Sequence, residues 1–362
     1  MKLTLLLPDL RGGGAERVMV DLAREFARQG HQVEFVLMQA LGELLPEAQA
    51  EFTVHDLSVS RARQLPRALA RHLRCHRPDA LLAAMWPLTV IAPMMRLAGY
   101  RGRIVVSEHN TLSVQYGSWG AAHRRALRSS MAVGYRLAHA RVGVSAGVAN
   151  DIATLSGLAR ARFEVIHNPA SPRPDPAGHA VVFAESLWPR PSGGRIVTVG
   201  SLKAQKNHPL LLHALARVSH LDACLTIVGA GAAEAELRRL AAELGIAERV
   251  VLAGFHPDPT PFYNTADLFV LSSDYEGFGN VIVEALAQGL PVVSTDCPSG
   301  PGEILEGGRW GALVPVGDAD ALAAAIDRAL ETPHDPAALR RRAADFAPEI
   351  AARKYLDLLG LT

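Results

Sequence analysis

This sequence contains few cysteines, and it has no hydrophobic run as long as the membrane-spanning segments of membrane proteins. The three cysteines, Cys75, Cys224 and Cys297, are scattered and odd in number, which argues against a disulfide framework and favours a reducing compartment. The longest charge-free stretch, residues 80–95, contains two prolines and is shorter than the ~20 residues that span a bilayer. We therefore expect a cytoplasmic protein whose contact with a membrane is at most peripheral.

Several sequence motifs of common enzyme classes are also missing. There is no GxxxxGK[ST] segment, and the glycines near residues 10–18 and 227–237 lack the GxGxxG spacing, which removes the main support for a P-loop NTPase or a dinucleotide dehydrogenase. No HExxH or CxxC pair accompanies the 14 histidines. Asp318 and Asp320 form a DxD, but they directly precede an alanine-rich helix and are better explained as its cap. We expect no metal site and no cofactor.

The net charge of +1 argues against a dedicated nucleic-acid binder, but it conceals an asymmetry between the two halves. Residues 1–170 contain 21 Lys+Arg and 13 Asp+Glu, a balance of +8, whereas residues 171–362 contain 16 and 23, a balance of −7. A basic N-terminal half is attracted to an anionic surface or substrate. A solvated, arginine-rich face explains the same count equally well.

Short apolar runs alternate with helical patterns along most of the chain. The first series, in residues 1–168, begins with "KLTLLLP", a helical pattern and "QVEFVLM", which is a βαβ unit of a parallel sheet. A proline-rich segment, 169–194, interrupts the rhythm, and a second series occupies residues 195–346. The sequence predicts an α/β protein of two Rossmann-like domains joined by a linker at 169–194, with ligands at the carboxyl ends of the strands.

Three segments at predicted carboxyl ends carry candidate binding groups. Gly13 and Gly14 stand at the start of a helix, where backbone N–H groups suit an anion. Lys203 and Lys206 follow the first strand of the second domain, where a lysine can reach a phosphate. His109, in "VVSEHNT", follows a strand of the first domain, and a structural role for it is as well supported as a functional one.

The stretch "EGFGNVIVE" contains two carboxylates, Glu276 and Glu284, on either side of a glycine-rich turn. The glycines predict a loop, with Asn280 as the N-cap of a helix that carries Glu284 in its opening turns. Backbone N–H groups at that helix start suit an anion, and the two carboxylates can accept hydrogen bonds from hydroxyls. A nucleotide-sugar, with its diphosphate, ribose and hexose, offers this combination of groups.

On these motifs the chain resembles the retaining GT-B glycosyltransferases of family four. "EGFGNVIVEALAQGLPVVSTD" is similar to that family's E-x7-E signature, "GGAERV" to its N-terminal glycine loop, and "GSLKAQKN" to its GRLxxxKG element. The resemblance implies two Rossmann-like domains facing across a central cleft, an N-terminal acceptor-binding domain, a C-terminal nucleotide-sugar-binding domain, and a helix at 347–362 that crosses back to the N-terminal domain.

The resemblance also implies roles for individual residues. Lys206 matches the lysine that neutralises the donor diphosphate, Glu284 the glutamate that holds the ribose, and Glu276 the glutamate that binds the transferred sugar. His109 aligns with a histidine near the reacting centre, and with Lys206 and Glu276 it makes up the expected catalytic set. The other expected donor-binding residues are Gly13, Gly14, Ser201, Lys203, Gly277, Phe278, Gly279 and Asn280. Ser201 replaces the family's usual arginine and so removes a bidentate phosphate donor.

The function that the resemblance implies is metal-independent transfer, with retention, of a hexose or N-acetylhexosamine from a UDP-sugar. The implied acceptor is a lipid-linked or polysaccharide hydroxyl in bacterial cell-surface glycan synthesis. Such acceptors place the enzyme at the inner face of the plasma membrane, and a row of arginines at helical spacing is a candidate contact with anionic lipid: Arg61, Arg63, Arg67, Arg71 and Arg74.

Paired carboxylates near a sugar are also compatible with a nucleotide-sugar epimerase or a retaining glycoside hydrolase. A non-catalytic nucleotide-sugar-binding protein is the third possibility, which Ser201 favours and the two glutamates with Lys206 oppose. Transfer to an acceptor, release of free sugar, and binding without turnover distinguish the three.

Overall fold

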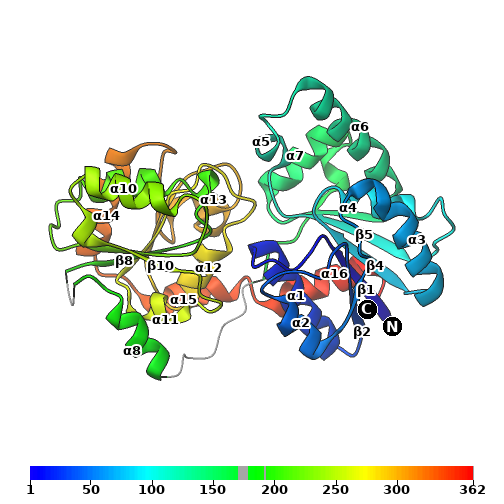
Figure 1. Cartoon of the computed structure of the whole chain (residues 1–362), viewed down its shortest axis with the longest axis horizontal. Helices are drawn as coiled ribbons and strands as arrows, with labels where there is room; N and C mark the ends of the chain where they lie inside the picture. The colour runs from blue at the N-terminus through cyan, green and yellow to red at the C-terminus, as the bar shows by residue number, and fades with distance from the viewer. Residues whose placement is uncertain (170–177, 191–192, 362) are drawn as a thin grey trace. The chain divides into compact units, whose positions relative to one another are not determined.

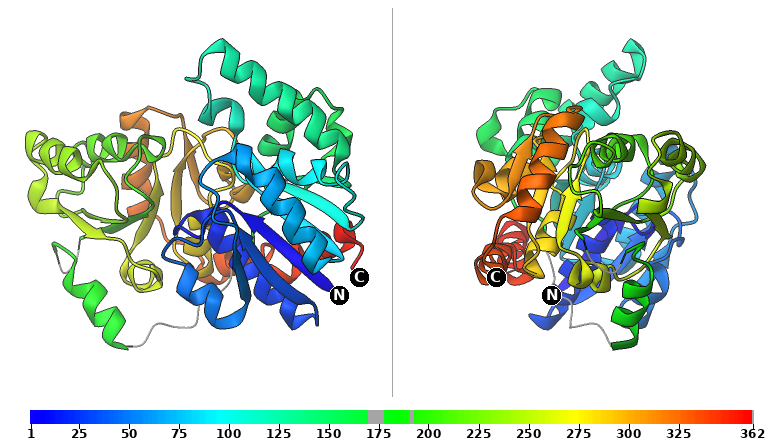
Figure 2. Two further views of the ribbon diagram at one scale, coloured as in Figure 1. Left: turned by 45° about the vertical axis from the view of Figure 1, so that its right-hand side comes forward. Right: turned by 90° about the vertical axis from the view of Figure 1, so that its left-hand side faces the viewer.

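The computed structural model describes residues 1–169, 178–190 and 193–361. The chain divides into two compact units, an N-terminal unit of Met1–Pro169 with Ala347–Thr362 and a C-terminal unit of Ala170–Phe346. Each unit is a parallel β-sheet with helices on both faces (Figures 1 and 2). Together they are the two Rossmann-like domains that the alternating sequence pattern predicts.

The sheet of the N-terminal unit has the order β3-β2-β1-β4-β5-β6-β7 among the described residues, and all its strand pairs are parallel. Its central strands are buried on both faces, which is why their sequences are apolar throughout instead of alternating. The strands are β1 Lys2–Leu7, β2 Gln32–Leu37, β3 Thr53–Asp56, β4 Ala80–Ala84, β5 Arg103–Glu108, β6 Ala140–Gly143 and β7 Glu164–Val165.

Two layers of helices cover this sheet. The first contains α1 and α16, which pack against each other (Figure 1). The second contains α3, α4, α6 and α7, which contact one another in sequence order. The helices are α1 Gly14–Arg28, α2 Leu45–Glu51, α3 Leu65–His76, α4 Leu88–Met94, α5 Leu112–Gln115, α6 Ala121–Leu137, α7 Ala146–Ser156 and α16 Pro348–Leu359, with 3-10 turns at η1 Ala62–Gln64 and η2 Arg160–Arg162.

The C-terminal unit has a parallel sheet of order β10-β9-β8-β11-β12-β13 over its described residues. Its strands are β8 Arg195–Val199, β9 Cys224–Val228, β10 Val250–Gly254, β11 Leu268–Leu271, β12 Val292–Thr295 and β13 Ala312–Val314. In both units the strand order reverses once, between β1 and β4 and between β8 and β11. Open parallel sheets bind ligands at such a reversal, beyond the carboxyl ends of the strands.

Helices α9, α10 and α14 cover one face of the C-terminal sheet, and α12 packs with α15 while α11 packs with α8. The helices are α8 Gly178–Ser186, α9 His208–Leu215, α10 Glu234–Glu243, α11 Thr260–Thr265, α12 Asn280–Ala287, α13 Pro301–Ile304, α14 Ala319–Glu331 and α15 Pro336–Ala344, with 3-10 turns at η3 Ala204–Lys206, η4 Ala247–Arg249 and η5 Glu306–Gly308. None of the helices in the described part of the chain is both long and apolar enough to cross a bilayer.

Three local expectations differ from the structure. Helix α8 lies inside the predicted linker 169–194, of which residues 170–177 and 191–192 lie outside the described residues. The N-cap of α12 is Gly279, with φ +97°, and not Asn280, which is the first helical residue. Such a φ is costly for a residue with a Cβ, so the glycine takes the cap position.

The predicted arginine row is also split by the structure. Arg67, Arg71 and Arg74 lie on α3, whereas Arg61 and Arg63 lie at and within the 3-10 turn η1 that precedes it. Arg61 at the start of η1 has extended backbone (φ −131°), so it lies outside the helix. All five side chains are exposed, but they do not share one helical face.

Candidate active site

The strongest concentration of predicted site residues lies at the reversal point of the C-terminal sheet. Strands β8 and β11 are neighbours there, so the turn after β8 and the loop after β11 meet. Gln205 Nε2 donates to the Tyr275 carbonyl at 2.9 Å, and the Asp274 N–H donates to the Gln205 carbonyl at 2.9 Å. The Asn207 amide also donates to Asp274 Oδ1 at 2.7 Å. These bonds hold the two loops in one arrangement.

Lys206 and Glu276 form an ion pair inside this arrangement. Lys206 Nζ lies 2.6 Å from Glu276 Oε1, and Ser273 Oγ donates to the same oxygen at 2.6 Å. The two side chains are 18% and 8% exposed, so the ammonium is largely shielded from solvent and the carboxylate is buried. A cation and a carboxylate at the carboxyl ends of the strands suit a ligand that carries both phosphate and hydroxyl groups.

The glycine-rich loop continues from Glu276 into α12. Gly279 caps this helix without a side-chain hydrogen bond, so the first turn of α12 presents backbone instead of a capping side chain. Gly300, at φ +92°, packs against this loop so closely that a Cβ there would lie 1.8 Å from the Phe278 carbonyl oxygen. Gly300 was not among the predicted site residues, although "PSGPG" marks a tight turn in the sequence.

Glu284 lies in the second turn of α12, as predicted. Its Oε2 accepts a hydrogen bond of 2.9 Å from the hydroxyl of Tyr263 on α11. Tyr263 is 2% exposed, so its ring is fixed by packing and holds the carboxylate in one orientation. Tyr263 was not among the predicted site residues, because nothing in the spacing links residue 263 to residue 284.

Gly229 and Gly231, which follow β9, lie against the turn after β8, and this contact explains why both are glycines. A Cβ at Gly229 would lie 1.9 Å from the Gly200 carbonyl oxygen, and one at Gly231 would lie 2.6 Å from the Leu202 carbonyl oxygen. The glycines therefore permit close backbone contact with the segment that contains Ser201, as expected of a strand-to-helix turn. Ser201 itself is partly buried there, and Lys203 is exposed at the start of η3.

Cys297 is another neighbour of the ion pair that the sequence did not indicate. It is 3% exposed, and burial, with the nearby Glu276 carboxylate, raises its pKa to about 12. The thiol is therefore protonated and unreactive at neutral pH.

The predicted DxD has the structural role expected of it, since Asp318 accepts a hydrogen bond of 2.8 Å from the Ala321 N–H at the start of α14.

In the N-terminal unit the glycine loop lies at the corresponding reversal of the sheet, after β1. Gly13 caps α1 and Gly14 is its first residue, and both are exposed. The preceding Gly12 N–H donates to Glu43 Oε2 at 2.9 Å, which fixes the path of the loop. The glycines thus begin a helix at the edge of the sheet where ligands bind.

His109 directly follows β5, as predicted, and is connected through Ser107 to a tyrosine of α16. Ser107 Oγ lies 3.2 Å from His109 Nε2 and 2.8 Å from the hydroxyl of Tyr355 on α16. The Nδ1 atom of His109 is buried without a hydrogen-bond partner in the described residues. Burial lowers the pKa of His109 to about 4, so the imidazole is neutral at pH 7. Its Nδ1 can then donate or accept a hydrogen bond, depending on the tautomer.

Glu108 is the buried acid beside His109 and was not predicted as a site residue. It is 1% exposed and accepts hydrogen bonds from the Tyr135 hydroxyl at 2.7 Å, from the Trp86 N–H at 3.2 Å and from the Thr89 hydroxyl. Burial raises the pKa of Glu108 to about 7 against the effect of these bonds. The group therefore tethers the ends of β4 and β5 to α4 and α6.

The histidines of α3 were also missed. His55 on β3 meets His72 and His76 on α3, and one nitrogen from each ring lies within 4.8 Å of the others. The i, i+4 spacing of His72 and His76 was a usable signal, whereas the approach of His55 depends on the packing of α3 over the sheet.

Family models match both units of the chain. The model described as Glycosyltransferase Family 4 matches residues 12–173, and the model described as Glycosyl transferases group 1 matches residues 193–332. The chain is a glycosyltransferase of group 1, family 4. This confirms the family that the E-x7-E segment and the glycine loop indicated.

Two relatives resemble the glycosyltransferase over nearly its whole length. One is the N-acetylgalactosamine-N,N'-diacetylbacillosaminyl-diphospho-undecaprenol 4-alpha-N-acetylgalactosaminyltransferase of Campylobacter jejuni, 28% identical over 91% of this chain and 90% of the relative. The other is the lipopolysaccharide core biosynthesis glycosyltransferase LpsE of Rhizobium meliloti, 28% identical over 96% of both chains.

The fold of the glycosyltransferase also matches solved structures. The crystal structure of Anabaena HepE in complex with UDP aligns with a TM-score of 0.84 over 100% of both chains at 22% sequence identity. At this identity the similarity establishes the fold, and it confirms the predicted GT-B class.

Proposed function

We propose that this glycosyltransferase moves a hexose or an N-acetylhexosamine from a UDP-sugar to a hydroxyl of a lipid-linked or polysaccharide acceptor, with retention of anomeric configuration. The observation that carries the proposal is the pairing of Lys206 with Glu276 at the reversal point of the C-terminal sheet. The UDP in the complex of HepE and the diphospho-undecaprenol in the name of the Campylobacter relative support the donor and the acceptor classes.

The C-terminal unit holds the donor in this proposal. Lys206 turns from Glu276 to the diphosphate, which carries more negative charge than one carboxylate, and the first turn of α12 adds backbone N–H groups. Glu276 then accepts hydrogen bonds from hydroxyls of the sugar, and Glu284, oriented by Tyr263, accepts those of the ribose. Gly277, Phe278, Gly279 and Asn280 line the donor with backbone, and Ser201 and Lys203 lie on the phosphate side.

The chemical step breaks the bond between the anomeric carbon and the phosphate oxygen and forms a bond from that carbon to the acceptor oxygen on the same face. The acceptor proton passes to the departing phosphate, so neither glutamate acts as a nucleophile. Lys206 offsets the charge that develops on the leaving group, and we expect activity to persist in EDTA. Neutral His109 donates a hydrogen bond at the reacting sugar, and Gly13 and Gly14 contact the donor phosphate or the acceptor.

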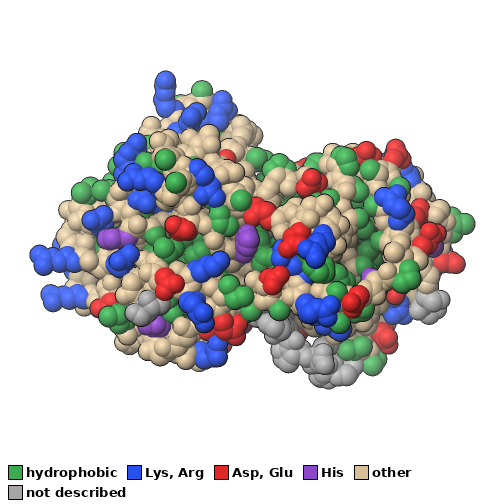
Figure 3. Space-filling model, turned by 180° about the vertical axis from the view of Figure 1, so that it is seen from behind, with side chains coloured by type: hydrophobic (Ala, Val, Ile, Leu, Met, Phe, Trp, Pro, Cys, Tyr) green, Lys and Arg blue, Asp and Glu red, His purple; other side chains and the backbone are tan. Residues whose placement is uncertain are grey.

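The N-terminal unit binds the acceptor in this proposal. Figure 3 shows Lys and Arg side chains spread over the surface of this unit, consistent with its basic composition. Arg67, Arg71 and Arg74 are exposed on α3 and provide charge for an anionic lipid surface. We propose that the enzyme acts from the cytoplasm as a peripheral protein at the inner face of the plasma membrane.

The test is a reaction of the purified enzyme with a panel of nucleotide-sugars and a polyprenyl-diphosphate-linked acceptor, with and without EDTA. We expect a glycosylated acceptor from a UDP-sugar in both conditions, with NMR showing the anomeric configuration of the donor retained. Release of free sugar would identify a hydrolase, interconversion of donor sugars an epimerase, and binding without turnover a non-catalytic protein. Any of these three outcomes overturns the proposal.

A further inference from the structure

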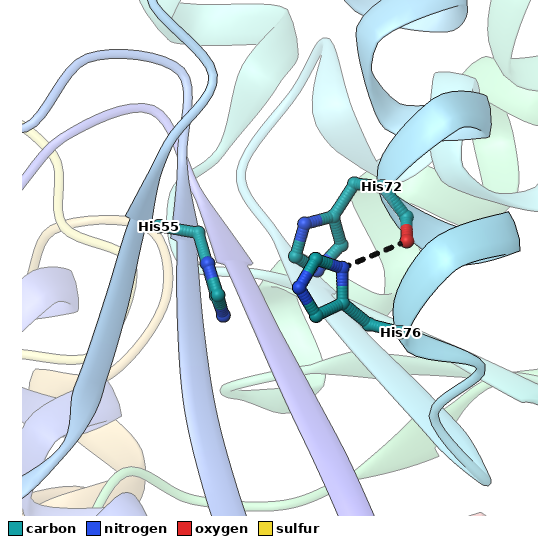
Figure 4. Close-up of side chains that lie close together, drawn as sticks. All are labelled: His55, His72 and His76. Atoms are coloured by element: carbon teal, nitrogen blue, oxygen red, sulfur yellow. Dashed lines mark hydrogen bonds between the residues drawn. The ribbon is translucent and has the colours of Figure 1, made fainter.

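Three histidines from two elements of the N-terminal unit point toward one another. His55 lies on β3, and His72 and His76 lie one turn apart on α3 (Figure 4). The ring centroids are 4.7 Å apart for His55 and His72, 4.6 Å for His55 and His76, and 4.1 Å for His72 and His76. Imidazole rings gathered this closely bring three potential metal ligands near one another.

The backbone fixes which nitrogen of His76 is available. His76 Nδ1 lies 3.1 Å from the His72 carbonyl oxygen, the contact that Figure 4 marks with a dashed line. Because a carbonyl oxygen can only accept, Nδ1 carries the hydrogen and Nε2 keeps its lone pair. This is the arrangement by which metal-binding histidines are oriented in known sites.

A buried carboxylate faces the same cluster. Glu34 on β2 is 3% exposed; its Oε1 lies 3.4 Å from His72 Nε2 and its Oε2 3.3 Å from His55 Nε2. Lys2 Nζ lies 2.8 Å from Glu34 Oε2 and balances its charge. The Lys2 side chain is 23% exposed, so it can move into solvent and leave the carboxylate to a cation.

We infer that His55, His72 and His76 form a binding site for a divalent transition-metal ion of the zinc class, with Glu34 as the adjacent carboxylate. Zinc accepts imidazole nitrogens at about 2.0–2.1 Å, so its ligand nitrogens lie about 3.4 Å apart in a tetrahedral site. The present limit of 4.8 Å therefore requires the rings to close by about 1.4 Å at the widest pair. His55, with 26% of its side chain exposed, has room for this rotation.

The place of the cluster in the fold indicates what the ion does. Among the described residues, strand β3 is the edge of the sheet and pairs with β2 alone, and α3 covers the neighbouring face. An ion held by one ligand from β3 and two from α3 links the edge strand to the helix. None of the residues that we assign to the donor or to the reacting sugar lies on β3 or α3, so the ion stabilises the N-terminal unit and takes no part in transfer.

Zinc titration of the full-length chain, without a histidine tag and after dialysis against EDTA, tests this inference. Isothermal calorimetry should show one Zn²⁺ bound per chain, Co²⁺ should give the visible absorption of a tetrahedral site, and Zn²⁺ should raise the melting temperature. His55→Ala and His76→Ala should each weaken Zn²⁺ binding more than about tenfold, since even indirect support of a ligand contributes about 10–100-fold. His334→Ala, which changes an exposed histidine outside the cluster, should leave the affinity unchanged.

His76 is the last residue of α3, so its truncation removes little packing, and far-UV circular dichroism without metal should match the unaltered chain. Two results overturn the inference: no Zn²⁺ bound at a tenfold excess of the metal, or equal affinity in the unaltered chain and in both cluster variants. Neither result depends on glycosyl transfer, so the test stands apart from the proposed function.

Discussion

Lys206 Nζ and Glu276 Oε1 are 2.6 Å apart although 70 positions separate the two residues in the chain. They meet because β8 and β11 are neighbours at the point where the strand order of the C-terminal sheet reverses. Each side chain is thus held by a loop that belongs to a different half of the sheet.

Lys206→Ala and Glu276→Ala should each lower transfer by well over tenfold while the protein stays folded. The first removes the cation that offsets the leaving diphosphate, and the second removes the acceptor of sugar hydroxyl bonds and leaves Lys206 unpaired. Steady-state kinetics with a saturating acceptor measures the effect. Lys354→Ala, an exposed lysine of α16, is the control, and near-normal turnover in either site variant would refute the assignment.

Tyr263→Phe should weaken donor binding by about two- to tenfold, as expected for one lost hydrogen bond, and should change kcat little. The reason is that the phenol hydroxyl orients Glu284, which in the proposed function binds the ribose and not the reacting bond. Calorimetry with UDP measures the change. Tyr100→Phe is the matched control, since it removes a tyrosine hydrogen bond to the Pro78 carbonyl in the N-terminal unit; equal losses in both variants would contradict the role of Tyr263.

Gly300→Ala should lower the free energy of unfolding by more than about 2 kcal/mol and should also weaken UDP binding. The added Cβ meets the Phe278 carbonyl oxygen at 1.8 Å, so the glycine-rich loop has to move. Gly307→Ala is the control, because Gly307 also has positive φ, +65°, but has open space around it. It should cost only the backbone strain of about 1 kcal/mol, with UDP binding retained.

The stability of the N-terminal unit should depend on the ionisation of Glu108. Burial raises its pKa to about 7 in the folded protein, whereas the unfolded chain ionises near the ordinary value of about 4.3. The contribution of Glu108 to stability is therefore complete below about pH 4 and is lost as the pH rises through 7, at about 1.4 kcal/mol per pKa unit.

Urea unfolding of the protein and of Glu108→Gln between pH 5 and 8 measures this contribution. Glutamine does not titrate, so the stability of the unaltered chain minus that of the variant should fall as the pH rises to 7 and then level off. A difference that is constant over this range would show that Glu108 is ionised throughout.

Charge reversal of Arg67, Arg71 and Arg74 on α3 should reduce binding to anionic vesicles in a sedimentation assay. The three side chains are exposed, and attraction between them and the lipid is weakened by salt. Reversal of Arg238 and Arg239, which are exposed on α10 of the C-terminal unit and paired with Glu234 and Glu243, is the control. Vesicle binding that does not change with salt, with lipid charge or with the α3 charge reversals would contradict the proposed membrane contact.

Much of the fold could be predicted from the sequence because its signals are local. Strands buried on both faces are apolar throughout, and helices between them have a period near 3.6, so both sheets and the cap at Asp318 follow from pattern. The position of Lys206 and Glu276 at carboxyl ends was predictable for the same reason. Their direct contact was not, because it depends on which strands are neighbours.

The residues that were missed act through contacts between distant segments. Tyr263 reaches Glu284, Gly300 reaches Phe278, and His55 reaches α3, each across a separation that no sequence period encodes. Glu108 stood in a quoted motif, yet its three hydrogen-bond donors come from α4, α6 and the end of β4. Long-range packing decides these contacts, and no local sequence pattern encodes that packing.

The fold of α16 back onto the N-terminal unit determines the order in which the protein can mature. Tyr355 is 1% exposed in the core of that unit, yet a ribosome adds it only after the entire C-terminal unit. The first 169 residues therefore emerge with an unfilled face against α1 and with Ser107 lacking its phenol partner. The core of the N-terminal unit is therefore completed only after α16 has been synthesised, whereas the C-terminal unit consists of one continuous segment and needs no later part of the chain.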